Sequence, residues 1–162
     1  MRKPVTAPFV LEDEAATGCL AAGLADALPA DTAGWIVLLQ GELGAGKSTF
    51  ARALVKRLGH RGPVPSPTYT LVEPYEVRGR VIYHIDLYRI NDPDELQYLG
   101  WSDWSDGMIL VEWPERAGTR LEHADVRVQL EYAGSGRKAT LTGHSERGNE
   151  LVRRAKPVSE DS

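Results

Sequence analysis

The segment from Gly41 to Ser48 constrains the fold of this chain more than any other part of its sequence. It reads Gly-Glu-Leu-Gly-Ala-Gly-Lys-Ser, which matches the phosphate-binding pattern G-x-x-x-x-G-K-[ST] at every defined position. Glycines allow the backbone to curl so that several N–H groups point toward one phosphate. We therefore expect a P-loop here, which requires a strand before it and a helix after it.

The residues on both sides of this segment fit a strand and a helix. Residues 35–40 read Trp-Ile-Val-Leu-Leu-Gln, which is apolar on both faces, as in a central parallel strand. Residues 47–58 place Phe50, Leu54 and Leu58 on one stripe, and Gly59 is the expected C-terminal stop. The N-terminus of this helix adds the positive end of its dipole to the phosphate site.

The rest of the chain is predicted to contain further helices and strands. Residues 12–28 have an amphipathic helical pattern with Asp13 as the N-cap. Strands are expected at residues 70–76, 80–86, 108–112, 125–132 and 138–142, the last two forming a hairpin, and a short helix at residues 92–100. Residues 60–70 contain three prolines and are expected to form an ordered loop.

Together these elements predict an α/β fold, a P-loop NTPase with a mainly parallel central sheet flanked by helices and a C-terminal antiparallel hairpin. We expect residues 1–144 to form a single P-loop ATPase domain. Residues 145–162 are polar, and we expect them to form a frayed or flexible tail.

Composition and charge exclude several other classes of protein. The chain has 162 residues, with 19 lysines and arginines against 23 aspartates and glutamates and a net charge of −4. This balance argues against a basic nucleic-acid clamp, and we expect no DNA binding. Cys19 is the only cysteine, so no intrachain disulfide can form and a reducing compartment is expected. The longest strongly apolar run, residues 35–39, is too short to cross a bilayer, so we expect a cytoplasmic protein without membrane contact.

The P-loop predicts how phosphates and a metal ion would be bound. The expected phosphate-binding residues are Glu42, Leu43, Gly44, Ala45, Gly46, Lys47, Ser48 and Thr49. Lys47 can reach the β- and γ-phosphates, and the Ser48 hydroxyl can ligate Mg²⁺. Asp86 and Glu112 end two apolar strands, and either could hold Mg²⁺ or orient an attacking water. The sequence leaves open which of the two acids touches the metal.

Three other features bear on the nucleotide. Thr68, in the proline-rich loop, is either a sensor of the γ-phosphate or part of an ordinary turn. His84 lies within an apolar strand, where it is either a base or a packed, hydrogen-bonded core residue. The asparagines Asn91 and Asn149 are not followed by lysine, so the guanine-reading motif Asn-Lys-x-Asp is absent and ATP is favoured.

Four motifs occur along the chain in a specific order and spacing. They are Gly41 to Ser48, Ser66-Pro67-Thr68-Tyr69, His84-Ile85-Asp86-Leu87-Tyr88-Arg89 and Glu112-Trp113-Pro114. Together they resemble the TsaE (YjeE) family, the small bacterial ATPases of tRNA threonylcarbamoyladenosine (t6A) synthesis, over residues 12–142. The resemblance implies ATP binding and slow hydrolysis with Mg²⁺. It also implies the TsaD and TsaB proteins as partners, through which the chain would act on tRNA indirectly.

The resemblance also implies roles for individual residues. Lys47 would be the phosphate lysine and Ser48 the metal hydroxyl, where the family usually has threonine. Thr68 would be the switch-loop threonine. Asp86 matches the acid of the H-x-D-L-Y-R motif, and Glu112 matches the acid of the E-W motif, implied as a metal ligand. The residues implied to lie near the nucleotide are Glu14, Thr17 and Arg137.

Three other functions compete with a switching ATPase. A small-molecule kinase would use the same P-loop but needs an acceptor pocket and usually an arginine-bearing lid. The sequence shows no clear lid segment, although Arg116 and Arg120 keep this alternative open. A nucleotide-sensing interaction protein would bind ATP without turning it over. Direct tRNA binding is the third alternative, against which the acidic balance argues.

Overall fold

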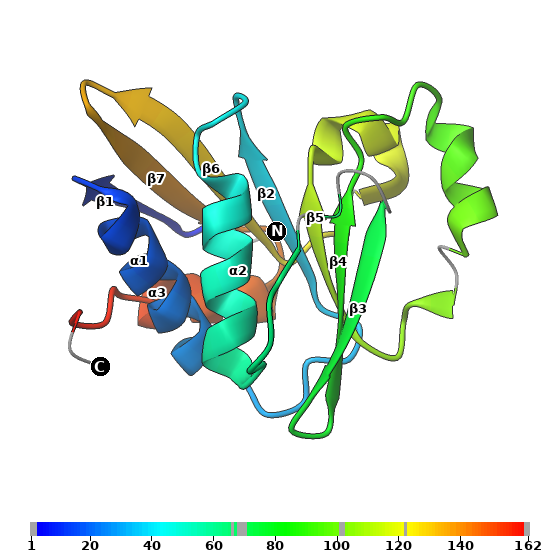
Figure 1. Cartoon of the computed structure of the whole chain (residues 1–162), viewed down its shortest axis with the longest axis horizontal. Coiled ribbons are helices and arrows are strands. Elements are labelled where there is room, and N and C mark those ends of the chain that lie inside the picture. Colours follow the sequence, from blue (N-terminus) through cyan, green and yellow to red (C-terminus); the bar gives the residue numbers. More distant parts are fainter. Residues whose placement is uncertain (1–2, 66, 68–70, 101–102, 122, 161–162) are drawn as a thin grey trace.

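The computed structural model describes residues 3–65, 67, 71–100, 103–121 and 123–160 (Figure 1). Within these residues, seven strands form one sheet in the order β1-β7-β6-β2-β5-β4-β3. The strands are β1 Thr6–Leu11, β2 Ile36–Gly41, β3 Val72–Val77, β4 Arg80–Asp86, β5 Met108–Glu112, β6 Val126–Ala133 and β7 Gly136–Gly143. The helices are α1 Glu14–Ala27, α2 Lys47–Leu58 and α3 Glu146–Arg154, with short 3₁₀ helices η1 Pro93–Leu99 and η3 Pro114–Leu121.

The middle of the sheet is parallel and its two edges are antiparallel. Strands β6, β2, β5 and β4 are parallel neighbours. Strand β6 returns through a hairpin into antiparallel β7, which also pairs with β1, while β3 pairs antiparallel with β4. The predicted α/β class, with a parallel centre and a C-terminal antiparallel hairpin, is confirmed. The pairing of β1 with β7 was not predicted.

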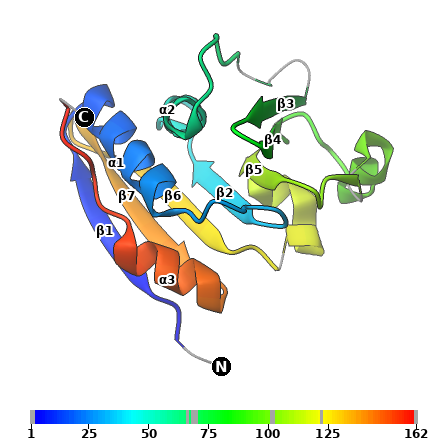
Figure 2. The ribbon, with the colours of Figure 1, turned by 90° about the horizontal axis from the view of Figure 1, so that it is seen from below.

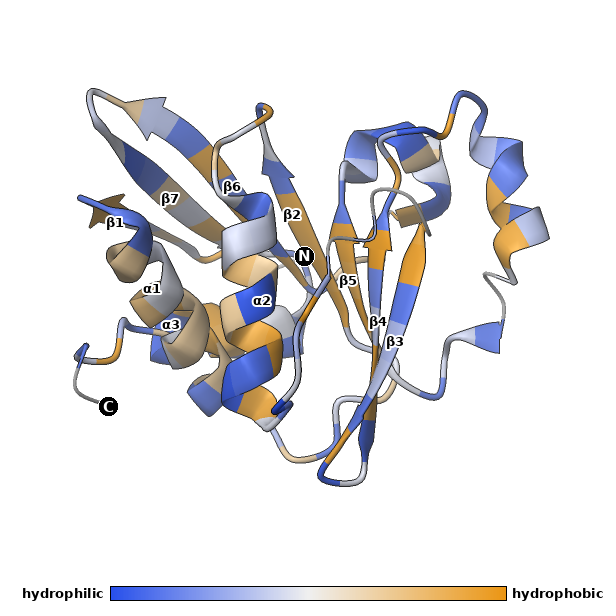
Figure 3. Ribbon diagram, viewed as in Figure 1, coloured by the Kyte–Doolittle hydropathy of each residue, from blue (hydrophilic) through white to orange (hydrophobic). Residues whose placement is uncertain are grey.

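Each face of the sheet is covered by a separate hydrophobic core. On one face, α1, α2 and α3 contribute buried side chains that include Leu24, Phe50 and Leu151. On the other face, Leu96 of η1 and Leu121 of η3 belong to the second core. Strands β2, β4 and β5 contribute buried residues to both cores. Strands β2 and β5 are mostly hydrophobic (Figure 3), as strands covered on both faces require. Helices α1 and α2 lie side by side (Figures 1 and 2).

Helix α2 begins and ends as the sequence predicts, and α1 is shorter than its predicted range of residues 12–28 but has the predicted N-cap. The Asp13 carboxylate caps α1 by accepting a hydrogen bond from the Ala16 N–H at 2.8 Å. Helix α2 spans Lys47–Leu58, and Gly59 follows it with a φ of 130°. In the described part of the chain, no helix has the length and apolar character needed to cross a membrane.

Three central parallel strands end beside one another, at the same end of the sheet as the P-loop. Strand β2 ends at Gly41, β4 at Asp86 and β5 at Glu112. Asp86 lies directly opposite Glu112 in the β4–β5 register. The carboxyl ends of parallel strands form the crevice in which α/β proteins bind ligands. The topology therefore gathers the loop and both acids that were singled out from the sequence.

The C-terminal segment differs from its prediction as a frayed or flexible tail over residues 145–162. Glu146–Arg154 form α3, and the Ser145 hydroxyl caps this helix by accepting from the Gly148 N–H at 2.9 Å. Leu151 and Val152 are buried against the core of α1 and α2. The prediction was wrong here because composition does not show that two adjacent apolar side chains of a polar helix can reach an existing core.

Asp125 ties α3 to the sheet. Its carboxylate accepts hydrogen bonds from the Ile36 N–H at 2.9 Å, the Ser145 hydroxyl at 2.7 Å and the Arg147 guanidinium at 2.9 and 3.0 Å. Asp125 is buried, and its hydrogen bonds raise the pKa of Arg147. One buried carboxylate thus joins the start of β2, the cap of α3 and the first turn of α3.

We predict that Asp125→Ala lowers the free energy of unfolding by about 3 kcal/mol, because it leaves three sets of donors without their buried acceptor. Urea unfolding followed by circular dichroism measures this change. Glu150→Ala is the matched control, since Glu150 forms ion pairs with Arg153 and Arg154 at the exposed surface, and it should cost less than about 0.5 kcal/mol. Equal losses in the two variants would contradict the role given to Asp125.

Candidate functional site

The P-loop has the backbone geometry that its glycines predict. Gly44 and Gly46 have φ values of 81° and 114°, in the region that side chains disfavour. A Cβ at Gly41 would lie 2.5 Å from the Leu130 carbonyl oxygen, so β6 leaves no space for a side chain there. The first of these constraints is conformational and the second is steric. Together they fix the loop between β2 and α2.

The β6–β7 hairpin holds the P-loop from one side. The Tyr132 hydroxyl donates a hydrogen bond to the Leu43 carbonyl oxygen at 2.6 Å. The Arg137 guanidinium lies 4.2 Å from the Tyr132 ring centroid and donates to the Gly44 carbonyl oxygen at 3.2 Å. Tyr132 was not singled out from the sequence, since a single aromatic residue near a hairpin turn carries no local signal of this contact.

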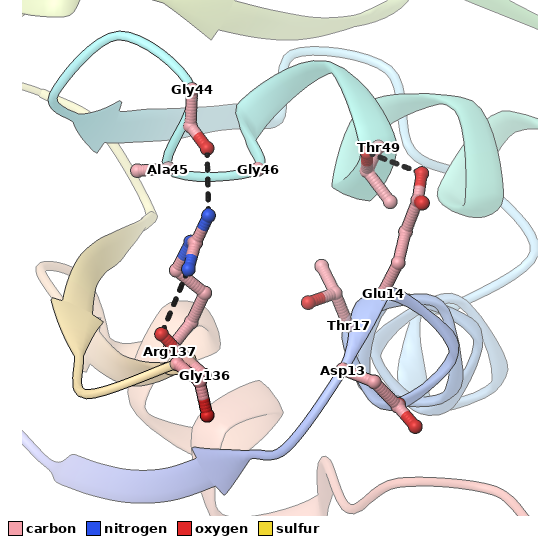
Figure 4. Close-up of a pocket in the computed structure, with 10 residues that line it drawn as sticks. Asp13, Glu14, Thr17, Gly44, Ala45, Gly46, Thr49, Gly136 and Arg137 are labelled. Carbon is pink, nitrogen blue, oxygen red and sulfur yellow. Dashed lines mark hydrogen bonds between the residues drawn. The ribbon is translucent and has the colours of Figure 1, made fainter.

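A cavity of about 300 Å³ lies between the P-loop, the start of α1 and the β6–β7 hairpin (Figure 4). Thr17 is buried at its wall, and the Thr49 hydroxyl donates to the Glu14 carboxylate at 3.2 Å. Arg137 lines the opposite side. The lining residues are Asp13, Glu14, Thr17, Gly44, Ala45, Gly46, Thr49, Ser135, Gly136 and Arg137. The structure thus brings together the three residues implied by resemblance to lie near the nucleotide.

A second cavity, of about 190 Å³, is also lined by the P-loop. Gly44, Gly46 and Thr49 line both cavities, so the two meet at the P-loop. The residues that line the second cavity are Leu43, Gly44, Gly46, Lys47, Ser48, Thr49, Asp86, Glu112 and Trp113. A ligand with a flat polar body in the first cavity could place a phosphate chain along the loop into the second.

Lys47 is buried and lies over the loop. Its Nζ donates to the carbonyl oxygens of Gly41 at 2.5 Å and Glu42 at 3.0 Å. It also lies 4.2 Å from the ring centroid of Trp113, a non-glycine residue with a φ of 59°. Burial lowers the pKa of Lys47, and the negative charges of Glu112, Glu115 and Asp86 oppose that change. The ammonium group is therefore held at the loop in a desolvated position.

Glu112 links the start of α2 to β4. The Ser48 hydroxyl donates to Glu112 Oε1 at 3.1 Å, and His84 Nε2 lies 2.7 Å from Glu112 Oε2. His84 and Glu112 are 1% and 2% exposed, so this contact is shielded from water. Of the two alternatives for His84, the structure shows a packed, hydrogen-bonded residue inside the sheet.

Asp86 lies in the same cavity but makes different contacts. It is buried, and its Oδ1 accepts a hydrogen bond from the Tyr88 N–H at 2.9 Å. The Ser48 hydroxyl, by contrast, donates its hydrogen bond to Glu112. Thr68, the third residue expected beside the phosphate, lies outside the residues that the structure describes.

The oxygen atoms of this cavity fit Mg²⁺ with phosphate ligands. Ser48, Asp86 and Glu112 offer the hard oxygen donors that Mg²⁺ prefers. Over the described part of the chain, no group of three or more histidine, cysteine, aspartate or glutamate side chains is placed to hold a metal by itself. Mg²⁺ usually binds through one or two carboxylates together with substrate phosphates and water. The donor set therefore suits a metal that arrives with a nucleotide.

The comparisons of sequence with known proteins all match proteins of one name, TsaE. A family model described as "Threonylcarbamoyl adenosine biosynthesis protein TsaE" matches residues 11–139. The chain is 42% identical over 119 residues to the tRNA threonylcarbamoyladenosine biosynthesis protein TsaE of Haemophilus influenzae, which covers 72% of this chain and 75% of that protein. It is 36% identical over 142 residues to the protein of the same name from Rickettsia felis, covering 85% and 81%. The crystal structure of Bacillus subtilis YdiB superposes with a TM-score of 0.72, at 27% identity over 94% of both chains.

We predict that Gly44→Ala weakens binding of a fluorescent adenine nucleotide by about 10-fold, because relief of the positive φ, which costs alanine about 1–2 kcal/mol, would shift the backbone of the phosphate-binding loop itself. The added Cβ would also lie 2.7 Å from the Tyr132 hydroxyl oxygen. Gly79→Ala is the matched control, since Gly79 has the same φ of 81° but open space around it in the β3–β4 turn. This control should lose stability and keep its affinity. Equal affinity losses in the two variants would contradict a local role of Gly44.

The lowered pKa of Lys47 predicts how nucleotide affinity depends on pH. As pH rises toward that pKa, the ammonium group loses its proton and its attraction for phosphate. Wild-type affinity for ADP should therefore begin to fall at a pH below the ordinary lysine pKa of 10.5. Equilibrium titrations measure this. Lys47→Arg keeps its charge at this pH, so its affinity should stay flat, and a parallel decline in both proteins would exclude Lys47 as the titrating group.

Proposed function

The chain belongs to the TsaE family of threonylcarbamoyl adenosine biosynthesis proteins, and on that premise we propose that it is a Mg²⁺-dependent ATPase that supports t6A modification of tRNA at position 37. It would hydrolyse ATP slowly and act as a nucleotide switch on a TsaB–TsaD complex. It would reach tRNA only through that complex, in the cytoplasm, where tRNA is modified.

The contact between Ser48 and Glu112 carries this proposal. It joins the hydroxyl of the P-loop motif to a strand-end carboxylate at 3.1 Å, inside a cavity that Lys47 also lines. A phosphate lysine, a metal-ligating hydroxyl and an acid on a neighbouring strand are the parts from which P-loop NTPases build their sites. A glycine-rich turn that only connects a strand to a helix would not need a buried acid at this point.

Each residue of the site has a defined part in this proposal. The N–H groups of the P-loop and the Lys47 ammonium bind the phosphates, for which Lys47 would exchange its carbonyl acceptors. Bound Mg²⁺ would neutralise charge on the phosphate oxygens. Ser48 and Glu112 would hold it, with Asp86 in reach of the same space. Asp86 or Glu112 would also orient the attacking water.

A backbone connection between the proline-rich loop and Asp86 supports the switching part of the proposal. The Asp86 N–H donates to the Leu71 carbonyl oxygen at 2.9 Å, and the Leu71 N–H donates to the Pro67 carbonyl oxygen at 2.7 Å. Leu71 has a φ of 69°, which is uncommon for a residue with a side chain. A change in the loop that carries Thr68 would therefore act on the backbone of the strand-end acid.

We predict that Lys47→Ala reduces ADP release from Mg-ATP by about 100-fold or more, as removal of a single charge-stabilising donor does in other active sites. A coupled assay of ADP release measures this. Lys56→Ala is the matched control, because Lys56 is an exposed residue of the same helix. Wild-type activity in Lys47→Ala would contradict the P-loop assignment.

Addition of purified TsaB–TsaD complex separates the switch from the other functions. The proposal expects the complex to change the wild-type rate of ADP release. Tight ATP binding without any turnover, with or without the complex, would indicate a nucleotide-sensing protein. A phosphorylated small-molecule acceptor in the reaction products would indicate a kinase instead.

A further inference from the structure

We propose that His84 is a positioning residue for Glu112, which fixes the carboxylate so that its second oxygen faces Ser48 and the metal that a nucleotide brings. The inference rests on the proposed function, since it concerns the same site. It adds a residue from β4 that touches neither phosphate nor metal in this proposal. Its effect would pass through the orientation of one carboxylate.

The sheet register places His84 where it can reach Glu112. In the β4–β5 pairing, His84 lies opposite Leu110, and Asp86 lies opposite Glu112. Side chains two residues apart on a strand share a face, so His84 and Glu112 are diagonal neighbours on one face of the sheet. The same face carries α2, on which Ser48 lies. The diagonal contact closes at 2.7 Å between His84 Nε2 and Glu112 Oε2.

The two oxygens of Glu112 differ in their contacts. Oε2 lies 2.7 Å from His84 Nε2, and the Ser48 hydroxyl donates to Oε1 at 3.1 Å, with a longer contact to Oε2 at 3.4 Å. A carboxylate accepts hydrogen bonds and donates none, so the Nε2–H of His84 is the donor in the first contact. His84 of β4 thus fixes Oε2, and Oε1 is directed at Ser48 in the first turn of α2. Without the first contact, a glutamate side chain with three rotatable bonds could turn the pair of oxygens away from Ser48.

The other ring nitrogen of His84 argues against a purely structural role. Nδ1 is buried, and no hydrogen-bond partner for it exists among the residues that the structure describes. A buried polar atom without a partner costs free energy, and an aliphatic side chain would fill the same space without that cost. The polar contact that the histidine does make is the one with Glu112. The hydrogen bond to the Glu112 carboxylate therefore explains a histidine at this position better than packing in the core does.

Side chains that hold a metal ligand in place without touching the metal are known to matter for affinity. Their loss typically costs about 10–100-fold in metal affinity or activity. A histidine that only filled the core would change stability and leave metal affinity alone. Metal affinity is therefore the measurement that separates the two roles.

Mn²⁺ binding tests the proposal without using activity. Mn²⁺ is titrated into the full chain in the presence of a non-hydrolysable ATP analogue, and free Mn²⁺ is read by electron paramagnetic resonance. We expect His84→Leu to weaken Mn²⁺ binding by about 10-fold or more. We expect His84→Gln, whose amide N–H can replace Nε2, to stay within about 3-fold of wild type, and His84→Asn, whose shorter amide corresponds to Nδ1, to behave like His84→Leu.

A double-mutant cycle asks whether His84 acts through Glu112. In a Glu112→Gln background, His84→Leu should cause no further loss of Mn²⁺ affinity. Wild-type Mn²⁺ affinity in His84→Leu, equal losses in His84→Gln and His84→Leu, or an undiminished effect in the Glu112→Gln background would each overturn the positioning role. If His84→Leu does not fold, the comparison of His84→Gln with His84→Asn decides alone. Absence of nucleotide-dependent Mn²⁺ binding in the wild type would instead overturn the proposed function, and the inference with it.

Discussion

The burial of the Glu112 carboxylate is the constraint on which the rest of the site depends. A buried carboxylate must be hydrogen-bonded or it costs several kcal/mol. Glu112 is 2% exposed, and its partners come from separate elements, Ser48 from α2 and His84 from β4. The sheet order that places β5 between β2 and β4 is what brings these partners together. The interaction that stabilises the acid is therefore the same one that aims it at the P-loop.

The P-loop is held by a second set of contacts from the opposite side. Tyr132 and Arg137 bind the carbonyl oxygens of Leu43 and Gly44, while Lys47 binds those of Gly41 and Glu42. With these carbonyls engaged by side chains, the N–H groups of the loop are left to face an anion. The antiparallel hairpin is thus more than a cover for the sheet edge, because it fixes the shape of the loop.

Local patterns predicted the fold and part of the site. The P-loop, α2 and β5 were predicted to the residue, because a turn motif, an apolar stripe and an apolar run are properties of short segments. Asp86 and Glu112 were both predicted as candidates, and the hydrogen bond that Glu112 accepts from Ser48 comes from the tertiary structure and not from a local pattern. Helix α3 and the contact of Tyr132 depend on residues far apart in the sequence, which no local pattern carries. The relation of His84 to Glu112 has the same origin, a diagonal pairing across two strands.

Backbone hydrogen exchange with and without Mg-ATP tests most directly whether the two cavities around the P-loop form one nucleotide site. The account predicts slower exchange in the P-loop, at the start of α1 around Thr17 and at the β6–β7 turn around Arg137, the segments that line these cavities. The edge strands β3 and β1 should exchange as before. Protection confined to other parts of the chain, or no protection at saturating Mg-ATP, would contradict the account.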